Sequence, residues 1–411
     1  MNRLAQASST EWRSHYTLPI AAMFGYSVSV IHIYGINPYI IPVTTEFGWS
    51  RAQFTGAFTF AILVQALLSV PVGILVDRFG SRRLGLAGIV MVCLAFILLG
   101  TATGSLTNWY LIWGLITLAA LAVQATVWTS AVASRFTASR GLAFAVTLCG
   151  ASIAQFAFPP LATKLIGAYG WKMAFLGHGL IWLAIVLPFV FFFFRGARDG
   201  ANAAEIASPV LDGISFAEGL RSTVYIRLLL ASLCFTFTIV ALNFQFMPIL
   251  VGWGIEAQNA AWLASLIGLA SIVGRLTTGW LIDHFSASHV GAVVFLLPIF
   301  AVLLLLFGQS YYLAPALVAI MLGLTLGAEV DVIVYLTTRF FGLRNFGALY
   351  GGLLAALSIG TAIGPLIASV IYDKTGCYDQ FFWLAIGLLL LSSASLFSLP
   401  KPPRIEVIDD V

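Results

Sequence analysis

The residues best suited to do chemistry are three ionisable side chains inside long apolar segments. Arg275 lies eight residues before Asp283, and Asp331 lies eight residues before Arg339, each at the end of such a segment. At about 1.5 Å of rise per helical residue, both side chains lie about 12 Å from that end, and Glu329 lies about 3 Å deeper. Opposite charges at equal depth on neighbouring helices are expected to pair, because an unpaired charge in a bilayer is costly. We therefore predict that Asp331 pairs with Arg275.

The two carboxylates are expected to have different roles. Glu329 and Asp331 are two positions apart, about 200° around a helix, so they cannot share a face. Burial disfavours the charged form of the less compensated Glu329, whereas a nearby guanidinium favours the charged form of Asp331. The sequence predicts that one carboxylate carries a proton and that the other is a structural or gating partner. A satisfied structural pair without any coupling role stays open.

Arg275 has two interpretations. A guanidinium binds a carboxylate through two parallel hydrogen bonds, which makes Arg275 a candidate fork for an anionic substrate. In the alternative, Arg275 is a structural partner of Asp331 that holds two helices together. Both can be true, since a substrate carboxylate can displace Asp331 from Arg275.

The segments that must position these side chains are membrane spans. The 411-residue chain is 60% hydrophobic and 9% charged, with a mean hydropathy of +1.00. Soluble domains carry about 25% charged residues, so this chain needs lipid as its solvent. A spanning helix needs about 20 mostly apolar residues. Twelve such segments are predicted, at 17–43, 50–76, 84–104, 108–134, 141–167, 172–194, 224–251, 258–282, 290–308, 313–337, 346–371 and 379–399.

The second half of the chain repeats the first. The stretch Gly73-Ile-Leu-Val-Asp77-Arg78-Phe returns about 206 residues later as Gly279-Trp-Leu-Ile-Asp283-His284-Phe. Further pairs at this offset are Asn37 and Asn243, Pro42 and Pro248, Gly48 and Gly254, and Gly170 and Gly376. One unit used twice predicts two six-helix bundles. The bundles are predicted at 1–194 and 224–411, with a polar linker at 195–223 that contains a short surface helix at 214–220.

The orientation follows from the basic residues of the loops. With the N-terminus inside, fifteen Lys and Arg lie on the inner side and four on the outer side. Cytoplasmic loops carry the excess of positive charge, so both termini are predicted to be cytoplasmic. Each half has an even number of spans, so the two halves are predicted to be parallel.

These features resemble the major facilitator superfamily. The motif Gly73–Arg83 resembles that family's turn between its second and third helices, and the likeness extends over essentially the whole chain. Within the family, the chain is most similar to monocarboxylate porters and oxalate/formate exchangers. This narrower resemblance rests on Glu46-Phe-Gly-Trp-Ser-Arg51, on Arg275 and on Arg339-Phe-Phe-Gly-Leu-Arg-Asn-Phe-Gly347. The chain departs from the animal porters at Tyr34–Tyr39, which has no lysine, and at Ser271, where they have aspartate.

Neutral polar residues inside the spans are candidates for substrate contacts. Asn37 and Asn243 occupy equivalent points of the repeat, and each is followed by a proline, which predicts local unwinding near the outer end. They are expected either to bind substrate, to form an outer gate, or to join helices. Further candidates for a cavity lining are His32, Tyr34, Gln124 and Tyr335. His32 is also a candidate proton carrier, with a satisfied bundle residue as the alternative.

A charged belt at the inner side is a candidate gate. The family motif implies that Asp77 and Arg78 hold the two halves together in the outward-open state, and Asp283, Arg135 and Arg339 are expected to complete this gate. The alternative is that these charges only keep their loops inside.

The chain is thus predicted to be a secondary transporter that works by alternating access. The first hypothesis is proton-coupled symport of a small organic anion, a monocarboxylate. Organic anion exchange of the oxalate/formate type and proton-driven efflux of an amphipathic compound stay open. The expected partners are the anion, protons and the lipid bilayer.

Other functional classes lack sequence support. The chain has no GxxxxGK phosphate loop, no nucleophile–base pair and no metal-ligand cluster, so neither an enzyme nor a cofactor is predicted. It has no basic patch interleaved with aromatic residues, so no nucleic-acid partner is expected. The short loops indicate a prokaryotic inner membrane, and we expect a monomer.

Overall fold

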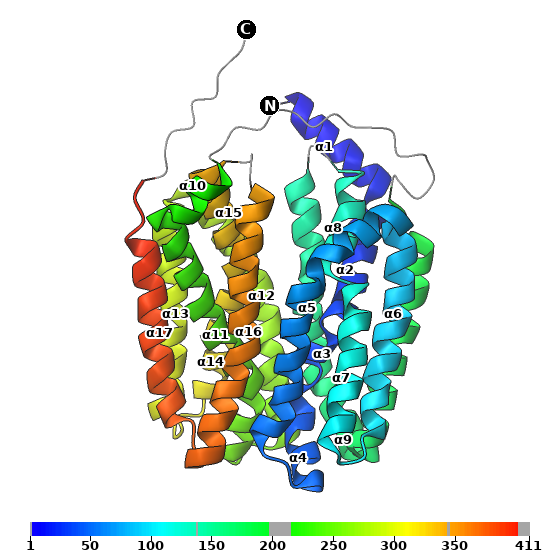
Figure 1. Cartoon of the computed structure of the whole chain (residues 1–411), viewed down its shortest axis with the longest axis vertical. Coiled ribbons are helices and arrows are strands. Elements are labelled where there is room, and N and C mark those ends of the chain that lie inside the picture. The colour runs from blue at the N-terminus through cyan, green and yellow to red at the C-terminus, as the bar shows by residue number, and fades with distance from the viewer. Residues whose placement is uncertain (1, 137–138, 197–214, 343–345, 402–411) are drawn as a thin grey trace. The chain divides into compact units, whose positions relative to one another are not determined.

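The computed structural model describes residues 2–136, 139–196, 215–342 and 346–401. Within these ranges, the side chains of 2–8, 69–79, 140, 283 and 346–348 are not described. The described chain is built from α-helices and two short 3₁₀-helices, η1 and η2 (Figure 1). The first half contains α1 (Asn2–His15), α2 (Thr17–Ser29), α3 (Ile31–Tyr34), η1 (Asn37–Tyr39), α4 (Ile40–Phe47), α5 (Arg51–Phe79), α6 (Ser81–Leu98), η2 (Leu99–Thr101), α7 (Leu106–Leu121), α8 (Ala125–Ala133) and α9 (Arg140–Phe193). The second half contains α10 (Phe216–Arg221), α11 (Thr223–Gly252), α12 (Ala257–His284), α13 (Ala287–Phe307), α14 (Ala314–Leu326), α15 (Glu329–Phe341), α16 (Phe346–Thr375) and α17 (Asp379–Phe397).

These helices account for the twelve predicted spans. In the described chain, 10 helical stretches are long and apolar enough to cross a membrane, and the bent pair Thr17–Ser29 and Ile31–Phe47 forms one more. The stretch Gly141–Phe193 has 53 residues. A helix of that length would extend about 80 Å, whereas the apolar core of a bilayer is about 30 Å thick. Gly170 interrupts it with φ 73° and ψ 163°, so it is two spans.

Two helices outside the spans differ in how well the sequence predicted them. The short helix predicted at 214–220 is confirmed as α10, whose N-cap Ser215 accepts a hydrogen bond from the backbone N–H of Glu218. The helix α1 was not predicted, because its many polar residues give no apolar segment. Its last turn carries Arg13 and His15, which suit the negative end of a helix dipole.

The internal repeat is visible in the backbone. Gly48 and Gly254, which are equivalent in the repeat, have φ of 65° and 85°. The equivalent pair Gly170 and Gly376 has φ of 73° and 75°. Left-handed conformations are costly for residues with a Cβ, so glycine is required at these turns. Equal spacing of the same uncommon conformation supports one structural unit used twice.

Contacts divide the chain into two compact units. One contains Met1–Glu205 and Phe244–Leu269, and the other contains Ile206–Asn243 and Ala270–Val411. The grouping differs from the predicted halves in that Phe244–Leu269 joins the first unit. The division into bundles at 1–194 and 224–411 stays a prediction.

The first unit is organised around aromatic side chains. Trp109, Trp113 and Trp128 are fully buried, and Tyr39 stacks on Phe175 with ring centroids 3.7 Å apart. Within this unit α2 packs against α9, and α5 packs against α7 (Figure 1). These contacts hold the broken first span, with η1 and α4, against the core of the unit.

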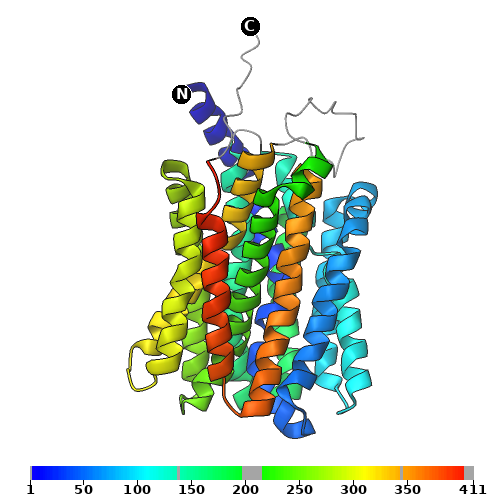
Figure 2. The ribbon, with the colours of Figure 1, turned by 60° about the vertical axis from the view of Figure 1, so that its left-hand side comes forward.

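The second unit is built from long helices packed side by side. Here α13 packs against both α14 and α17, and α15 packs against α16 (Figure 2). Phe235 of α11 stacks on Phe295 of α13, with ring centroids 3.8 Å apart. This packing fixes the position of α15, which carries both candidate carboxylates.

Candidate charged site

A break in the tenth span positions the two carboxylates. The span was predicted as one continuous helix, but α14 ends at Leu326 and α15 begins at Glu329. At the break, the N–H of Ala328 bonds the carbonyl of Thr325 at 3.1 Å, which is a tighter turn than an α-helix. Glu329 and Asp331 therefore lie in the first turn of α15. The positive end of a helix dipole stabilises negative charge in that turn.

Glycines bring α12 against the break. A Cβ at Gly327 would collide with the carbonyl oxygen of Ser271, and a Cβ at Gly274 would collide with that of Leu324. Only glycine allows two backbones to approach this closely. Since Gly274 adjoins Arg275 on α12, this contact delivers the guanidinium to the start of α15.

The predicted pairing of Arg275 with Asp331 is confirmed. Arg275 Nη1 donates to Asp331 Oδ1 at 3.2 Å and to Oδ2 at 3.3 Å. The side chains are 13% and 31% exposed, so the ion pair is largely withdrawn from solvent. Only one guanidinium nitrogen takes part, whereas the strongest arginine–carboxylate pairs use two. Arg275 Nε is buried and has no hydrogen-bond partner among the described residues.

Glu329 lies deeper in the same region. It is 7% exposed, and no basic nitrogen lies within ion-pair distance of it in the described part of the chain. Glu329 shares the first turn of α15 with Asp331, so the charge of Arg275, which contacts Asp331, also lies near Glu329. One cation therefore serves two carboxylates, one in direct contact and one at longer range.

The C-terminal part of α15 carries two further candidates. The Arg339 guanidinium lies 5.8 Å from the centroid of the Tyr335 ring, a cation–π distance. Tyr335 is half-buried, and Arg339 is exposed. Their assignments to a substrate site and to a gate stay predictions.

Four of the candidate residues belong to the first unit. His32 is buried edge-to-face against Trp113, with ring centroids 6.3 Å apart. Tyr34 is half-buried at the end of α3, and Asn37 is buried at the start of η1. Gln124 is half-buried at the N-cap position of α8.

Gln124 lies at a second helix break, which was not predicted from the sequence. The fourth span was predicted as one helix, but α7 ends at Leu121 and α8 begins at Ala125. A break within a span exposes backbone groups that need new partners. The carbonyl of Val123 receives hydrogen bonds from the Trp128 indole N–H, at 2.8 Å, and from the Ser29 hydroxyl.

The unwinding predicted next to the two asparagines occurs in one case only. The chain forms the 3₁₀-helix η1 at Asn37, within a span bent by 46°. The prediction is wrong for Asn243, because α11 continues through it and through Pro248 to Gly252. A proline late in a long helix is tolerated when neighbouring helices hold the helix in place. Asn243 is buried in this continuous helix.

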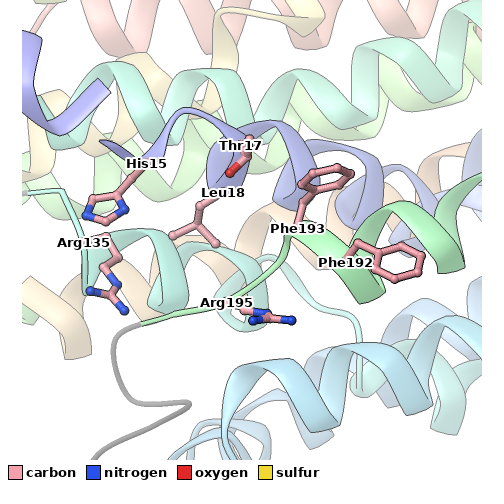
Figure 3. Close-up of a pocket in the computed structure, with 7 residues that line it drawn as sticks. All are labelled: His15, Thr17, Leu18, Arg135, Phe192, Phe193 and Arg195. Carbon is pink, nitrogen blue, oxygen red and sulfur yellow. The ribbon is translucent and has the colours of Figure 1, made fainter. Parts of the chain in front are cut away.

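The candidate gate is only partly described. The side chains of Asp77, Arg78 and Asp283 lie outside the described residues. Arg135, which follows α8, is exposed and lines a cavity together with His15 and Arg195 (Figure 3). The gating roles of these residues stay predictions.

Comparison with known proteins identifies the family. The family model described as Major Facilitator Superfamily matches residues 22–328 and 229–409. The chain belongs to this superfamily. It is therefore a multi-pass membrane transporter and not an enzyme, and the expected twelve-helix, all-α architecture is confirmed.

Individual relatives support the narrower resemblance. Monocarboxylate transporter 13 of Rattus norvegicus is 27% identical over 403 residues, which is 94% of this chain and 91% of the relative. Monocarboxylate transporter 13 of Bos taurus is 29% identical over 92% of this chain and 86% of the relative. MFS transporter asaE of Aspergillus flavus is 25% identical over 79% of this chain and 72% of the relative. The resemblance to monocarboxylate porters is confirmed.

Solved structures show the same fold. A D-xylose-proton symporter has a TM-score of 0.72 at 13% identity, covering 94% of this chain and 97% of that one. A bacterial homologue of the human lysosomal transporter Spinster, inward-facing and occupied, has a TM-score of 0.69 at 17% identity, covering 94% and 96%. At these identities, the likeness concerns the fold alone.

Proposed function

We propose that this transporter carries a small organic anion, a monocarboxylate, by alternating access, and that a proton moves with it. The main support for this proposal is the geometry of Arg275. It pairs with Asp331 through one nitrogen and keeps a buried Nε without a partner among the described residues. A buried donor without an acceptor costs about 1–3 kcal/mol. An incoming carboxylate supplies the missing acceptor and can form the two-bond pairing that Asp331 does not form.

The nature of the relatives supports the choice of substrate. The relatives with high coverage of this chain are named monocarboxylate transporters. Arg275 is the arginine that contacts a carboxylate of α15, and one guanidinium suits an anion with one carboxylate. Specificity for the rest of the substrate is assigned to Asn37, Asn243, Tyr34, Tyr335, Gln124 and His32, which remain candidates.

The coupled proton is assigned to the carboxylates of α15. When the substrate carboxylate takes the guanidinium, Asp331 loses its partner, and the site then holds three carboxylates and one arginine. Protonation of Glu329 or Asp331 removes one negative charge, which matches the one charge that the substrate brought. We assign this proton to Glu329, because it is the more buried carboxylate and is not in contact with Arg275. Movement of one anion with one proton is then electroneutral.

Uptake into proteoliposomes tests this function. A panel of radiolabelled organic anions is offered under an inward proton gradient, with internal anion, or with neither. We expect a monocarboxylate to accumulate under the proton gradient alone. Uptake that requires internal anion would identify an exchanger instead. The absence of transport for every carboxylate would refute the proposal and favour the alternative, efflux of amphipathic compounds.

A further inference from the structure

A cavity in the first unit is lined by described residues other than those assigned to transport specificity and coupling. Its volume is about 340 Å³, and it is lined by His15, Thr17, Leu18, Arg135, Phe192, Phe193 and Arg195. Figure 3 shows that the basic side chains come from three places in the chain: the end of α1, the residues after α8 and the residues after α9. These are the ends of helices that the orientation prediction places at the cytoplasmic side.

The wall of this cavity is held in place by specific contacts. Glu11 of α1 accepts hydrogen bonds from the backbone N–H of Ser139, at 3.1 Å, and from its hydroxyl, at 2.9 Å. Trp12 packs edge-to-face on Phe136, with ring centroids 5.2 Å apart. These contacts fasten α1 to the segment after α8, so His15 and Arg135 line the same cavity.

The cavity is positively charged. It is lined by two arginines and a histidine, and none of the described residues that line it is acidic. In the part of the chain that the structure describes, neither Arg135 nor Arg195 forms an ion pair with a carboxylate. Guanidinium groups suit phosphate oxygens, because they offer several N–H donors in one plane. The chemistry of the cavity therefore fits a phosphate group.

One side of the cavity is apolar and exposed. Phe192 is 62% exposed and Phe193 is 44% exposed, although both end a membrane span. The neighbouring Phe191 is also exposed, and Arg82 lies 5.5 Å from its ring and donates to its carbonyl at 2.6 Å. Aromatic and basic residues at the end of a span mark the level of the lipid headgroups. A ligand bound here meets both cations and an exposed apolar helix.

We propose that this cavity binds the phosphate of an anionic phospholipid, with the acyl chains lying along the exposed end of α9. A soluble phosphate would use the arginines but would leave the phenylalanines without a role. A zwitterionic headgroup would add an ammonium next to three basic side chains, which disfavours it. Basic pockets at the cytoplasmic ends of spans suit such headgroups.

Native mass spectrometry of the full-length protein tests this site. The protein is released from detergent and titrated with phosphatidylglycerol, phosphatidylcholine or inorganic phosphate. The variants are Arg135→Gln and Arg195→Gln, and Arg221→Gln is the matched control. Arg221 is an exposed arginine at the end of α10, on the same predicted side, and it does not line the cavity. Thermal unfolding in phosphatidylcholine verifies that each variant is folded.

The proposal predicts preferential binding of phosphatidylglycerol by the wild type. Each cavity variant should weaken this binding about fivefold, the effect expected for one basic residue near a lipid surface. Arg221→Gln should change it less than twofold. An equal loss of phosphatidylglycerol binding in all three variants would show that basic residues attract the lipid anywhere on this surface, and it would overturn the proposed site. Inorganic phosphate that competes at concentrations similar to the lipid would overturn the lipid as the ligand.

Discussion

At the scale of single residues, Arg275 is the side chain on which the proposed function depends most. Its ion pair with Asp331 uses one guanidinium nitrogen and leaves Nε buried without a partner among the described residues. Lysine would keep the positive charge but would lack the planar fork. Replacing this arginine with lysine therefore tests whether the site needs only a positive charge or also two parallel hydrogen bonds.

Arg275→Lys should lower carboxylate uptake about 10- to 100-fold, because a hydrogen bond to a charged group contributes about 1.5–3 kcal/mol. Initial uptake rates in proteoliposomes measure this effect. Lys164→Arg is the control, since Lys164 is an exposed basic residue of α9 in the first unit. Wild-type rates in Arg275→Lys would mean that any positive charge suffices at this position.

Glu329→Gln should separate proton coupling from substrate movement. The amide has the shape of the acid but cannot release a proton, so accumulation driven by a pH gradient should disappear. The rate of exchange of internal for external anion should stay within about threefold of the wild type, because the neutral amide lets the anion bind on either side without a proton. Asp331→Asn is the companion variant, and loss of pH-driven accumulation only in that variant would move the coupling role to Asp331.

The ion pair is also the part of the site that could be predicted from sequence. The rise per helical residue converts residue spacing into depth in the membrane. Arg275 and Asp331 have the same predicted depth, because each lies eight residues before a charged residue at the end of its span, Asp283 or Arg339. The burial of Glu329 followed from the same count. The unpartnered Nε could not be predicted, because it depends on side-chain geometry within the packed helices.

At the scale of elements, helix breaks position the candidate residues. The fourth span breaks between Leu121 and Ala125, and the tenth breaks between Leu326 and Glu329. The two breaks occupy equivalent points of the repeat. Hydropathy continues through both, so apolar composition gave no indication of either. Gly327 was the one local signal, since glycine lowers helix stability and allows close backbone approach.

Gly327→Ala should disturb the approach of α12 to α15. The added methyl group would collide with the Ser271 carbonyl oxygen, and overpacking of this kind costs about 1–3 kcal/mol. We expect a lower thermal unfolding temperature and a loss of uptake. Gly387→Ala in α17 is the matched control, because a Cβ there meets no atom within 4 Å of the described chain. Equal unfolding temperatures for both variants would refute the close contact.

At the scale of the whole molecule, the repeat was the most informative sequence feature. Glycines paired by the offset of 206 residues adopt the same left-handed conformation, and the family comparison supports the architecture that the repeat predicted. Side chains of the repeated motif itself, Asp77, Arg78 and Asp283, lie outside the described residues. The relatives named above come from mammals and a fungus, and the prokaryotic inner membrane stays a prediction.

The predicted orientation can be tested with a natural cysteine. Cys377 is exposed in the turn between α16 and α17, whereas Cys93 and Cys234 are buried within spans. Cytoplasmic termini and twelve spans place this turn outside the cell. A membrane-impermeant maleimide should label intact cells at Cys377, and Cys377→Ser should abolish the signal. Labelling that requires broken cells would reverse the orientation.

The central claim is that the transporter recognises a carboxylate through Arg275. The most direct measurement compares uptake of a labelled monocarboxylate with uptake of its primary amide, which has nearly the same size but no charge. In wild-type proteoliposomes under an inward proton gradient, the carboxylate should enter at least about 10-fold faster, since one charge-assisted hydrogen bond separates the two ligands. Arg275→Lys should reduce this preference. Equal uptake of the acid and the amide by the wild type would contradict the account.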